Sequence, residues 1–158
     1  MRCVVQRVLS SSVEVGGNIV AQIEKGLNVL VGVENGDTEK DAEYIAEKLF
    51  GLRIFEDEEG KTNKNISDLK GKTGNAGIIL ISQFTLLGDV RHGKRPAFIS
   101  ACEPVLANEL YMYLVKLMRD NCEPLGITVG TGVFRAEMKV NIVNDGPFTI
   151  LLDSRKVF

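Results

Sequence analysis

The sequence predicts an α+β fold in which an antiparallel or mixed β-sheet, or a barrel-like core, carries two main amphipathic helices. Three observations support this prediction. Short β-branched runs fill the first third of the chain, two segments have apolar residues at helical spacing, and further strand-like runs close the chain. No linker, composition shift or internal repeat divides the sequence, so we expect one domain over residues 1–158.

Four strand-like runs precede Glu34 and are rich in β-branched and apolar residues. A polar break at Ser10–Ser12 separates the first run from the second, and Gly16-Gly17 is typical of a two-residue hairpin turn between the second and the third. The fourth run is almost entirely apolar, which predicts a buried central strand. In order, the runs are Arg2 to Val8, Val13 to Val15, Asn18 to Ile23 and Leu27 to Val33.

Two helices are predicted from apolar residues that recur every three or four positions. The first follows Thr38, whose hydroxyl is available to the unpaired amides of the first turn, and Gly51 is a suitable stop. The second begins near Pro104, because proline is favoured in a first turn, and ends at Asn121 to Pro124. The apolar stripes are Ala42, Ile45, Ala46 and Leu49 in the first helix and Leu106, Leu110, Tyr113, Leu114 and Leu117 in the second.

Strand-like runs and polar loops fill the rest of the chain. The stretch from Glu56 to Asn75 is polar, and we expect an exposed loop with one short turn near Ile66–Leu69. Apolar Met138, Val140 and Ile142 alternate with polar neighbours, so this strand should bury one face and expose the other. The predicted strands are Leu52 to Phe55, Gly77 to Phe84, Ile127 to Val129, Ala136 to Val143 and Phe148 to Leu152.

Composition and charge argue against several classes of function. The formal net charge is -2, so nucleic acid would have to be bound locally and through few phosphates. The apolar runs are too short to cross a bilayer, and we expect no signal peptide and no membrane association. With three cysteines and one histidine the chain has no zinc-site spacing, so we expect no metal, no cofactor, and free thiols in a reducing cytoplasm.

Two polar segments far apart in the chain carry the candidate chemistry. Ser82-Gln83-Phe84-Thr85-Leu86 ends an apolar strand with two hydroxyls and an amide, which need partners because an unpaired buried polar group costs about 1–3 kcal/mol. Asn144-Asp145-Gly146-Pro147-Phe148-Thr149 places a Gly-Pro pair between two apolar runs, where a ladder hydrogen bond is given up. Each segment alone is compatible with an ordinary strand end or a tight turn. Together they favour a polar pocket walled by rigid backbone.

These two segments resemble the two signature motifs of the D-aminoacyl-tRNA deacylases, the DTD family. The similarity extends from Met1-Arg2 through the Arg95-Pro96 loop to Leu151-Leu152-Asp153. The resemblance implies a DTD-like fold and a cytoplasmic homodimer without cofactor. It also implies the activity, hydrolysis of the ester that joins a D-amino acid, or glycine on the wrong tRNA, to the terminal ribose.

The resemblance also implies roles for residues within the two segments. It assigns catalysis to Ser82, Gln83 and Thr85, which with nearby backbone amides would hold the terminal ribose and the developing oxyanion. Phe84 would contact the substrate. Gly146-Pro147 would form a cis pair that reaches into the active site of the partner subunit. There its carbonyls would bind the substrate amino group and leave no room for an L side chain.

Two further groups of residues resemble family features, and each has an ordinary alternative. Phe134 and Met138 match the apolar wall of the family pocket, although they equally suit a hydrophobic core. Arg91, Lys94 and Arg95 suit phosphates at the acceptor end of tRNA, although a solvated loop is equally compatible.

The chemical mechanism has one favoured reading and several alternatives. Thr85 is the obvious side-chain nucleophile, but the sequence offers no base to activate it. We therefore favour attack by water that the ribose 2′-hydroxyl helps to position, with covalent catalysis by Thr85 second. Two rivals from other classes are a general esterase or peptidase that pairs Thr85 or Ser82 with His92, and a non-catalytic RNA-binding module.

Three positions depart from the family pattern. Phe148 stands where the family usually has a small branched residue, which would reshape the pocket entrance. Arg135 stands where glycine is usual, so the local backbone or a tRNA contact should differ. Ala97 replaces a common serine and removes one hydroxyl.

Overall fold

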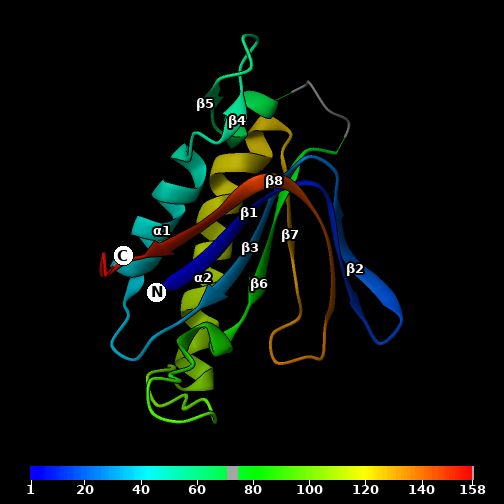
Figure 1. Cartoon of the computed structure of the whole chain (residues 1–158). Helices are drawn as coiled ribbons and strands as arrows, with labels where there is room; N and C mark the ends of the chain where they lie inside the picture. Colours follow the sequence, from blue (N-terminus) through cyan, green and yellow to red (C-terminus); the bar gives the residue numbers. More distant parts are fainter. Residues whose placement is uncertain (71–74, 158) are drawn as a thin grey trace.

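The computed structural model describes residues 1–70 and 75–157, and it confirms the predicted α+β class. A six-stranded mixed sheet runs in the order β2-β1-β3-β6-β7, and β8 pairs with the free edge of β1, so that the sheet is nearly barrel-shaped (Figure 1). The two helices lie side by side on one face of the sheet. The main elements are β1 (Arg2–Val15), β2 (Asn18–Ile23), β3 (Gly26–Gly32), α1 (Glu39–Gly51), β6 (Gly77–Ser82), α2 (Pro104–Cys122), β7 (Thr128–Thr131) and β8 (Lys139–Asp153).

Strand β1 is continuous, so the predicted break at Ser10–Ser12 is wrong. Both edges of β1 are paired along most of its length, by β3 and then β2 on one side and by β8 on the other. Ser11 is buried, and its hydroxyl lies 3.1 Å from Asn28 Oδ1 and 3.0 Å from the Asn141 carbonyl oxygen. Polar side chains therefore do not interrupt this strand, because partners from distant strands satisfy them.

Strand β8 is also a single element where two closing strands were predicted. It pairs with β1 from Lys139 to Asp153, and the register shifts opposite the stretch of β1 between Gln6 and Ser10. The Asn144–Thr149 segment is thus an irregularity inside one long strand rather than a connection between two. Such bulges often re-aim a side chain or a stretch of backbone.

Several other predicted boundaries are wrong by a few residues. Strand β6 ends at Ser82 rather than Phe84, because the chain enters a short 3-10 helix, η2 (Phe84–Leu87). Leu106 is 39% exposed, since it lies in the first turn of α2, outside the buried stripe. The predicted strand at Leu52–Phe55 is only β4 (Phe55–Glu56), and the polar stretch after it contains β5 (Thr62–Lys64) and η1 (Ile66–Leu69). Residues 71–74 of that stretch lie outside the described residues. A short 3-10 helix, η3 (Glu123–Leu125), follows α2.

The sheet separates two apolar clusters. The larger cluster lies between the sheet and the helices and includes Ile45, Leu49, Leu110 and Leu114. The smaller one lies within the curve of the sheet and consists of Val8, Val13, Ile23, Ile79 and Ile81. In the described residues, no helix has the length and apolarity needed to cross a membrane.

Candidate active site

A pocket of about 500 Å³ opens where the parallel strands β3 and β6 end. Carboxyl ends of parallel strands commonly border ligand sites in α/β sheets. The first turns of α2 and the connection between β7 and β8 complete the walls. The predicted site residues that line this pocket are Ser82, Gln83, Phe84, Phe134 and Met138, whereas Thr85, Gly146 and Pro147 do not line it.

The strand-end motif, Ser82 to Leu86, is held by backbone hydrogen bonds at the mouth of the pocket. The Gln83 amide donates to the Val31 carbonyl at 2.7 Å, which ties the end of β6 to β3. The Gln83 side-chain amide donates to the Thr85 hydroxyl, and Thr85 is exposed. A carboxamide cannot take up a proton as a general base does, so this contact orients the Thr85 hydroxyl without activating it.

Apolar side chains form the inner wall of the pocket. Phe134 is half-buried, with its ring centroid 6.1 Å from that of Tyr111. The Tyr111 hydroxyl donates to the Leu80 carbonyl at 2.8 Å, and burial raises the pKa of Tyr111. Met138 packs tightly on Gly132, where an added Cβ would lie 2.5 Å from the Met138 sulfur. This wall is therefore ordered by packing before any ligand binds.

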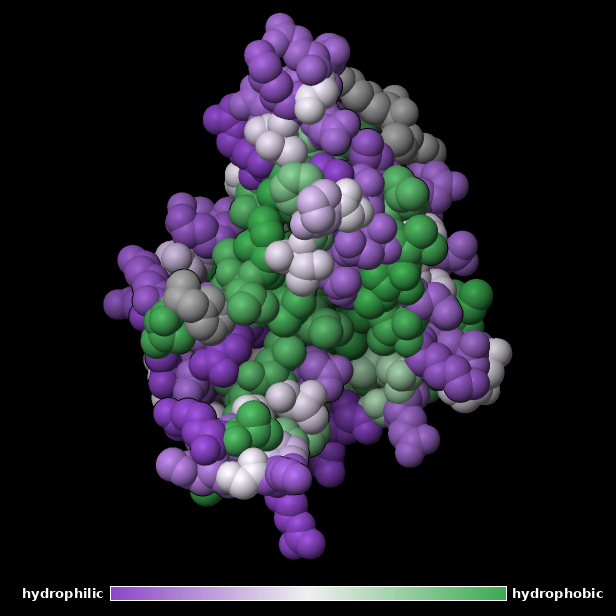
Figure 2. Space-filling model, in the orientation of Figure 1, coloured by the Kyte–Doolittle hydropathy of each residue, from purple (hydrophilic) through white to green (hydrophobic). Residues whose placement is uncertain are grey.

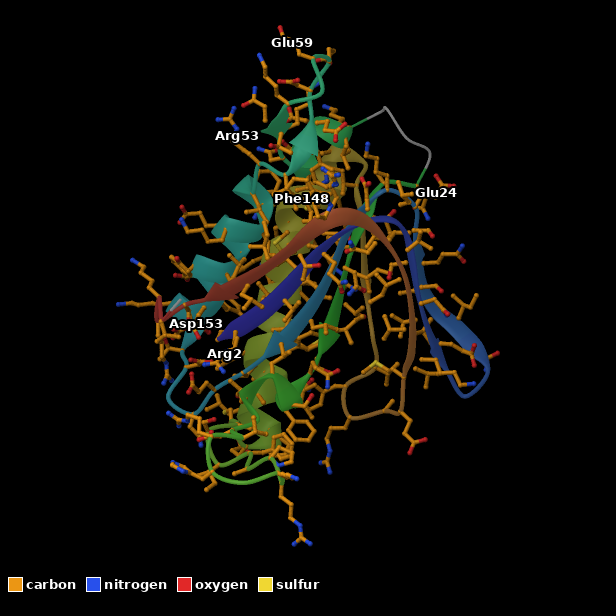
Figure 3. The ribbon with its side chains drawn as sticks, viewed as in Figure 1. Arg2, Glu24, Arg53, Glu59, Phe148 and Asp153 are labelled. Carbon is orange, nitrogen blue, oxygen red and sulfur yellow. The ribbon has the colours of Figure 1, made fainter. Side chains whose placement is uncertain are left out.

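The Gly146-Pro147 peptide bond is cis, but the pair lies away from the pocket. It belongs to the irregular part of β8, near the end of the sheet where β6 begins. Arg2 contacts η2 through the Leu86 carbonyl at 3.1 Å, and Figure 3 shows Phe148 and Arg2 apart along the sheet. From the strand register, the two motifs are roughly 20 Å apart within one chain.

Arg7 supports the Gly146-Pro147 segment from the helix side of the sheet, and the sequence reading missed it. Its buried Nε lies 2.8 Å from Asp145 Oδ2, in an ion pair that is not a well-aligned hydrogen bond. Its guanidinium carbon lies 4.2 Å from the Phe148 ring centroid, and Nη1 donates to the Ile54 carbonyl at 2.6 Å. An arginine among inward-facing apolar residues of the first strand was the signal that could have identified it.

The basic loop, residues 89–97, contacts the pocket through a pair of aromatic rings. Asp89 and Ala97 close the loop with two backbone hydrogen bonds of 2.8 and 2.9 Å, and the Phe98 ring packs edge-on against Phe84 with centroids 5.0 Å apart. The Arg91 guanidinium donates to Asp89 at 2.6 and 2.9 Å and lowers the pKa of that carboxyl to about 2. Arg91 is thus already neutralised by a neighbouring carboxylate.

Lys94, Arg95 and His92 are exposed in the same loop, and none of them lines the pocket. Within residues 1–70 and 75–157, no group of three or more His, Cys, Asp or Glu side chains is arranged to hold a metal ion. The described residues that line the pocket offer hydroxyl, amide, thiol and backbone groups and one guanidinium, that of Arg135.

A family model described as D-Tyr-tRNA(Tyr) deacylase matches residues 4–153. The chain belongs to this family. It is 51% identical over 158 residues to a D-aminoacyl-tRNA deacylase of Thermosipho melanesiensis and 52% identical over 158 residues to that of Clostridium tetani, with 100% of each chain covered. A solved structure named c-Myc DNA unwinding element binding protein has a TM-score of 0.87 and 38% identity, and the match covers 97% of this chain and 98% of that one.

Phe148, Arg135 and Ala97, the three positions that the sequence analysis expects to differ from the family, have different surroundings. Phe148 stacks on Arg7 and does not line the pocket of its own chain. Arg135 lines the pocket and adopts a positive φ of 63°. Ala97 exchanges two backbone hydrogen bonds with Asp89, which a serine at this position could also make. Of these three residues, only Arg135 lines the pocket.

Proposed function

We propose that this protein hydrolyses the ester that joins a D-amino acid to the terminal ribose of tRNA. One observation carries the proposal: the family match over residues 4–153 includes the strand-end motif, and this motif borders the pocket of about 500 Å³. A pocket of that volume is within the range used for small ligands. Glycine has no side chain to be excluded, so glycine on the wrong tRNA is a second expected substrate.

The pocket supplies what ester hydrolysis needs, which is positioning and stabilisation of negative charge. An aminoacyl ester is already activated, so no metal is required for its cleavage. In the proposed mechanism Ser82, Gln83 and Thr85 hold the terminal ribose and the developing oxyanion, and the ribose 2′-hydroxyl positions the attacking water. Phe84, Phe134 and Met138 surround the terminal nucleotide.

Replacing Thr85 with alanine should lower kcat by about 10- to 100-fold, which corresponds to about 1.4–2.7 kcal/mol and is the size of one hydrogen bond to a group that carries charge. Because Thr85 contacts the Gln83 amide and has no base beside it, the native enzyme should form no acyl-enzyme. Single-turnover kinetics measure the first effect, and mass spectrometry of acid-quenched enzyme measures the second. A D-aminoacyl adduct on Thr85 would show that covalent catalysis operates instead.

The proposed chiral filter is Gly146-Pro147 acting in trans from a second copy of the chain. The pair is exposed and roughly 20 Å from Ser82 within one chain, so it can serve the pocket only if a partner subunit supplies it. Its backbone carbonyls would bind the substrate amino group, and an L side chain would collide with the same backbone.

The open face of the sheet offers a surface for that partner subunit. Figure 2 shows apolar residues gathered over the sheet face that is turned away from the helices. Leu151 alternates with Ile150 and Leu152, which pack on the helix side, so Leu151 points to this open face, and it is 54% exposed. Val4 is its partner in β1. A second sheet covering these side chains would give the proposed homodimer.

The tRNA end is proposed to approach along the basic loop. Lys94 and Arg95 are exposed and meet phosphates, whereas the charge of Arg91 is largely balanced by Asp89. Such contacts add affinity without selecting a nucleotide sequence. We place the activity in the cytoplasm, where aminoacyl-tRNA is made and used.

A turnover assay tests the function. Catalytic amounts of enzyme should deacylate D-tyrosyl-tRNA over many cycles and leave L-tyrosyl-tRNA intact. His92→Ala should be as active as the wild type, because His92 is exposed and outside the pocket. Collapse of this variant would instead support a His92-dependent esterase, and binding of tRNA without turnover would support a non-catalytic RNA-binding module.

A further inference from the structure

Arg135 occupies a backbone position that disfavours an arginine. It is the third residue of a turn closed by the Ala136 amide, which donates to the Val133 carbonyl at 3.1 Å. Its φ is 63°, in the left-handed region that glycine adopts freely and that residues with a Cβ rarely adopt. Unfavourable backbone conformations of this kind concentrate at functional sites. The turn would form more easily with glycine. The arginine side chain at position 135 therefore indicates a role other than forming the turn.

The Arg135 side chain also has a distinctive chemical setting. It is the one charged residue among the described residues that line the pocket, whose other walls are apolar or neutral. No hydrogen bond or ion pair joins its guanidinium to the described residues 1–70 and 75–157. Arg91, which lies in the basic loop and does not line the pocket, is by contrast paired with Asp89. Arg135 is exposed, so its guanidinium presents an uncompensated positive charge to solvent at the pocket, where a charged ligand can reach it.

We propose that Arg135 binds the phosphate group on the 5′ side of the terminal nucleotide of the tRNA. This inference rests on the proposed function, in which Ser82 and Thr85 hold the ribose of that same nucleotide. The amino group of the aminoacyl moiety is cationic and would be repelled by a guanidinium, whereas a phosphate accepts two parallel N–H bonds from it. Arg135 is thus a substrate-positioning residue that places the ester against the strand-end motif.

The test compares Arg135→Gly, Arg135→Lys and wild type on three substrates, which are D-tyrosyl-tRNA, D-aspartyl-tRNA and 3′-D-tyrosyl-adenosine. For D-tyrosyl-tRNA, Arg135→Gly should raise KM about tenfold, with kcat nearly unchanged, and Arg135→Lys should retain part of the affinity. The slope of log affinity against log salt should fall by about 0.7, the value for one phosphate of a single strand. For 3′-D-tyrosyl-adenosine, which has no phosphate, wild type and variants should react alike. The melting temperature of Arg135→Gly should not fall, because glycine suits the turn.

Each alternative outcome is distinguishable. Equal KM and equal salt slope for wild type and Arg135→Gly would overturn the proposal, as would an equal loss on 3′-D-tyrosyl-adenosine. A loss confined to D-aspartyl-tRNA would mean that the guanidinium recognises an acidic amino-acid side chain and not the phosphate. The dissociation constants of uncharged tRNA for wild type and Arg135→Gly are measured in parallel. They test the contact between Arg135 and the phosphate even if the wild type shows no turnover. Absence of turnover by the wild type would refute the proposed function.

Discussion

A Gly146→Ala enzyme should keep its fold and lose at least about 100-fold in the rate of D-aminoacyl-tRNA hydrolysis, a loss of about 2.7 kcal/mol of transition-state stabilisation. Within the chain the added methyl has room, since its nearest neighbour is Asn144 Nδ2 at 3.4 Å. Gly146 also lies outside the left-handed region that would penalise alanine. The methyl would therefore act mainly on the substrate side, where the proposed filter leaves no space. Single-turnover rates on D- and L-tyrosyl-tRNA measure the effect.

Gly51→Ala is the matched control for this substitution. Gly51 also lies outside the left-handed region, and a Cβ there meets no atom within 4 Å. It ends α1, remote from both motifs, so this variant should behave as wild type. If Gly146→Ala hydrolysed D-tyrosyl-tRNA at the wild-type rate and still spared the L form, Gly146 would not belong to the filter.

Subunit mixing decides whether the filter acts in trans. Thr85→Ala and Gly146→Ala chains should each be defective alone. A mixed dimer would contain one site with an intact Thr85 and an intact Gly146, contributed by different chains. Refolding the two variants together should restore up to about a quarter of wild-type activity, because half of the dimers are mixed and each holds one intact site. No recovery in a mixture of confirmed dimers would place both residues in one chain's site.

An Arg7→Met enzyme should be destabilised by about 3 kcal/mol and should lose activity by a factor comparable to that of Gly146→Ala. The substitution leaves the Asp145 carboxylate without its partner and the Ile54 carbonyl without its donor. This loss of about 3 kcal/mol in the free energy of unfolding is at the lower end of the range for a broken buried ion pair, because Asp145 is 27% exposed. The Phe148 ring also loses the guanidinium that it stacks on. Urea unfolding and the turnover assay measure the two effects.

Lys139→Met is the control for Arg7. Lys139 pairs with Glu14 at 3.3 Å across the same two strands, β8 and β1, but its side chain is 82% exposed. An exposed pair contributes about 0–1 kcal/mol, so this variant should be nearly as stable as wild type. In a double-mutant cycle, Arg7→Met and Asp145→Asn should not add, because each removes the same contact. Additive effects would show that the two side chains act independently.

Local sequence information was sufficient for much of the fold. The α1 stripe of Ala42, Ile45 and Leu49 is buried as its spacing predicts, because amphipathic helices bury the face that the pattern marks. The Gly16-Gly17 hairpin forms with both glycines at positive φ. Other parts of the fold depend on contacts between residues that are distant in the sequence. Ser11 stays in a strand because its buried hydroxyl donates to Asn28, and the residues around Ser11 do not predict that partner.

The candidate site, too, was predicted in part from local sequence and depends in part on tertiary structure. The chemistry of Ser82 to Thr85 was readable because an apolar strand that turns polar needs partners wherever it lies. The pocket walls and the support from Arg7 were decided by tertiary structure, since they join residues more than 100 positions apart. The distance of Gly146-Pro147 from Ser82 was decided there too. Side-chain chemistry and periodicity are local properties, whereas strand register and the way a sheet curves determine which of those side chains meet.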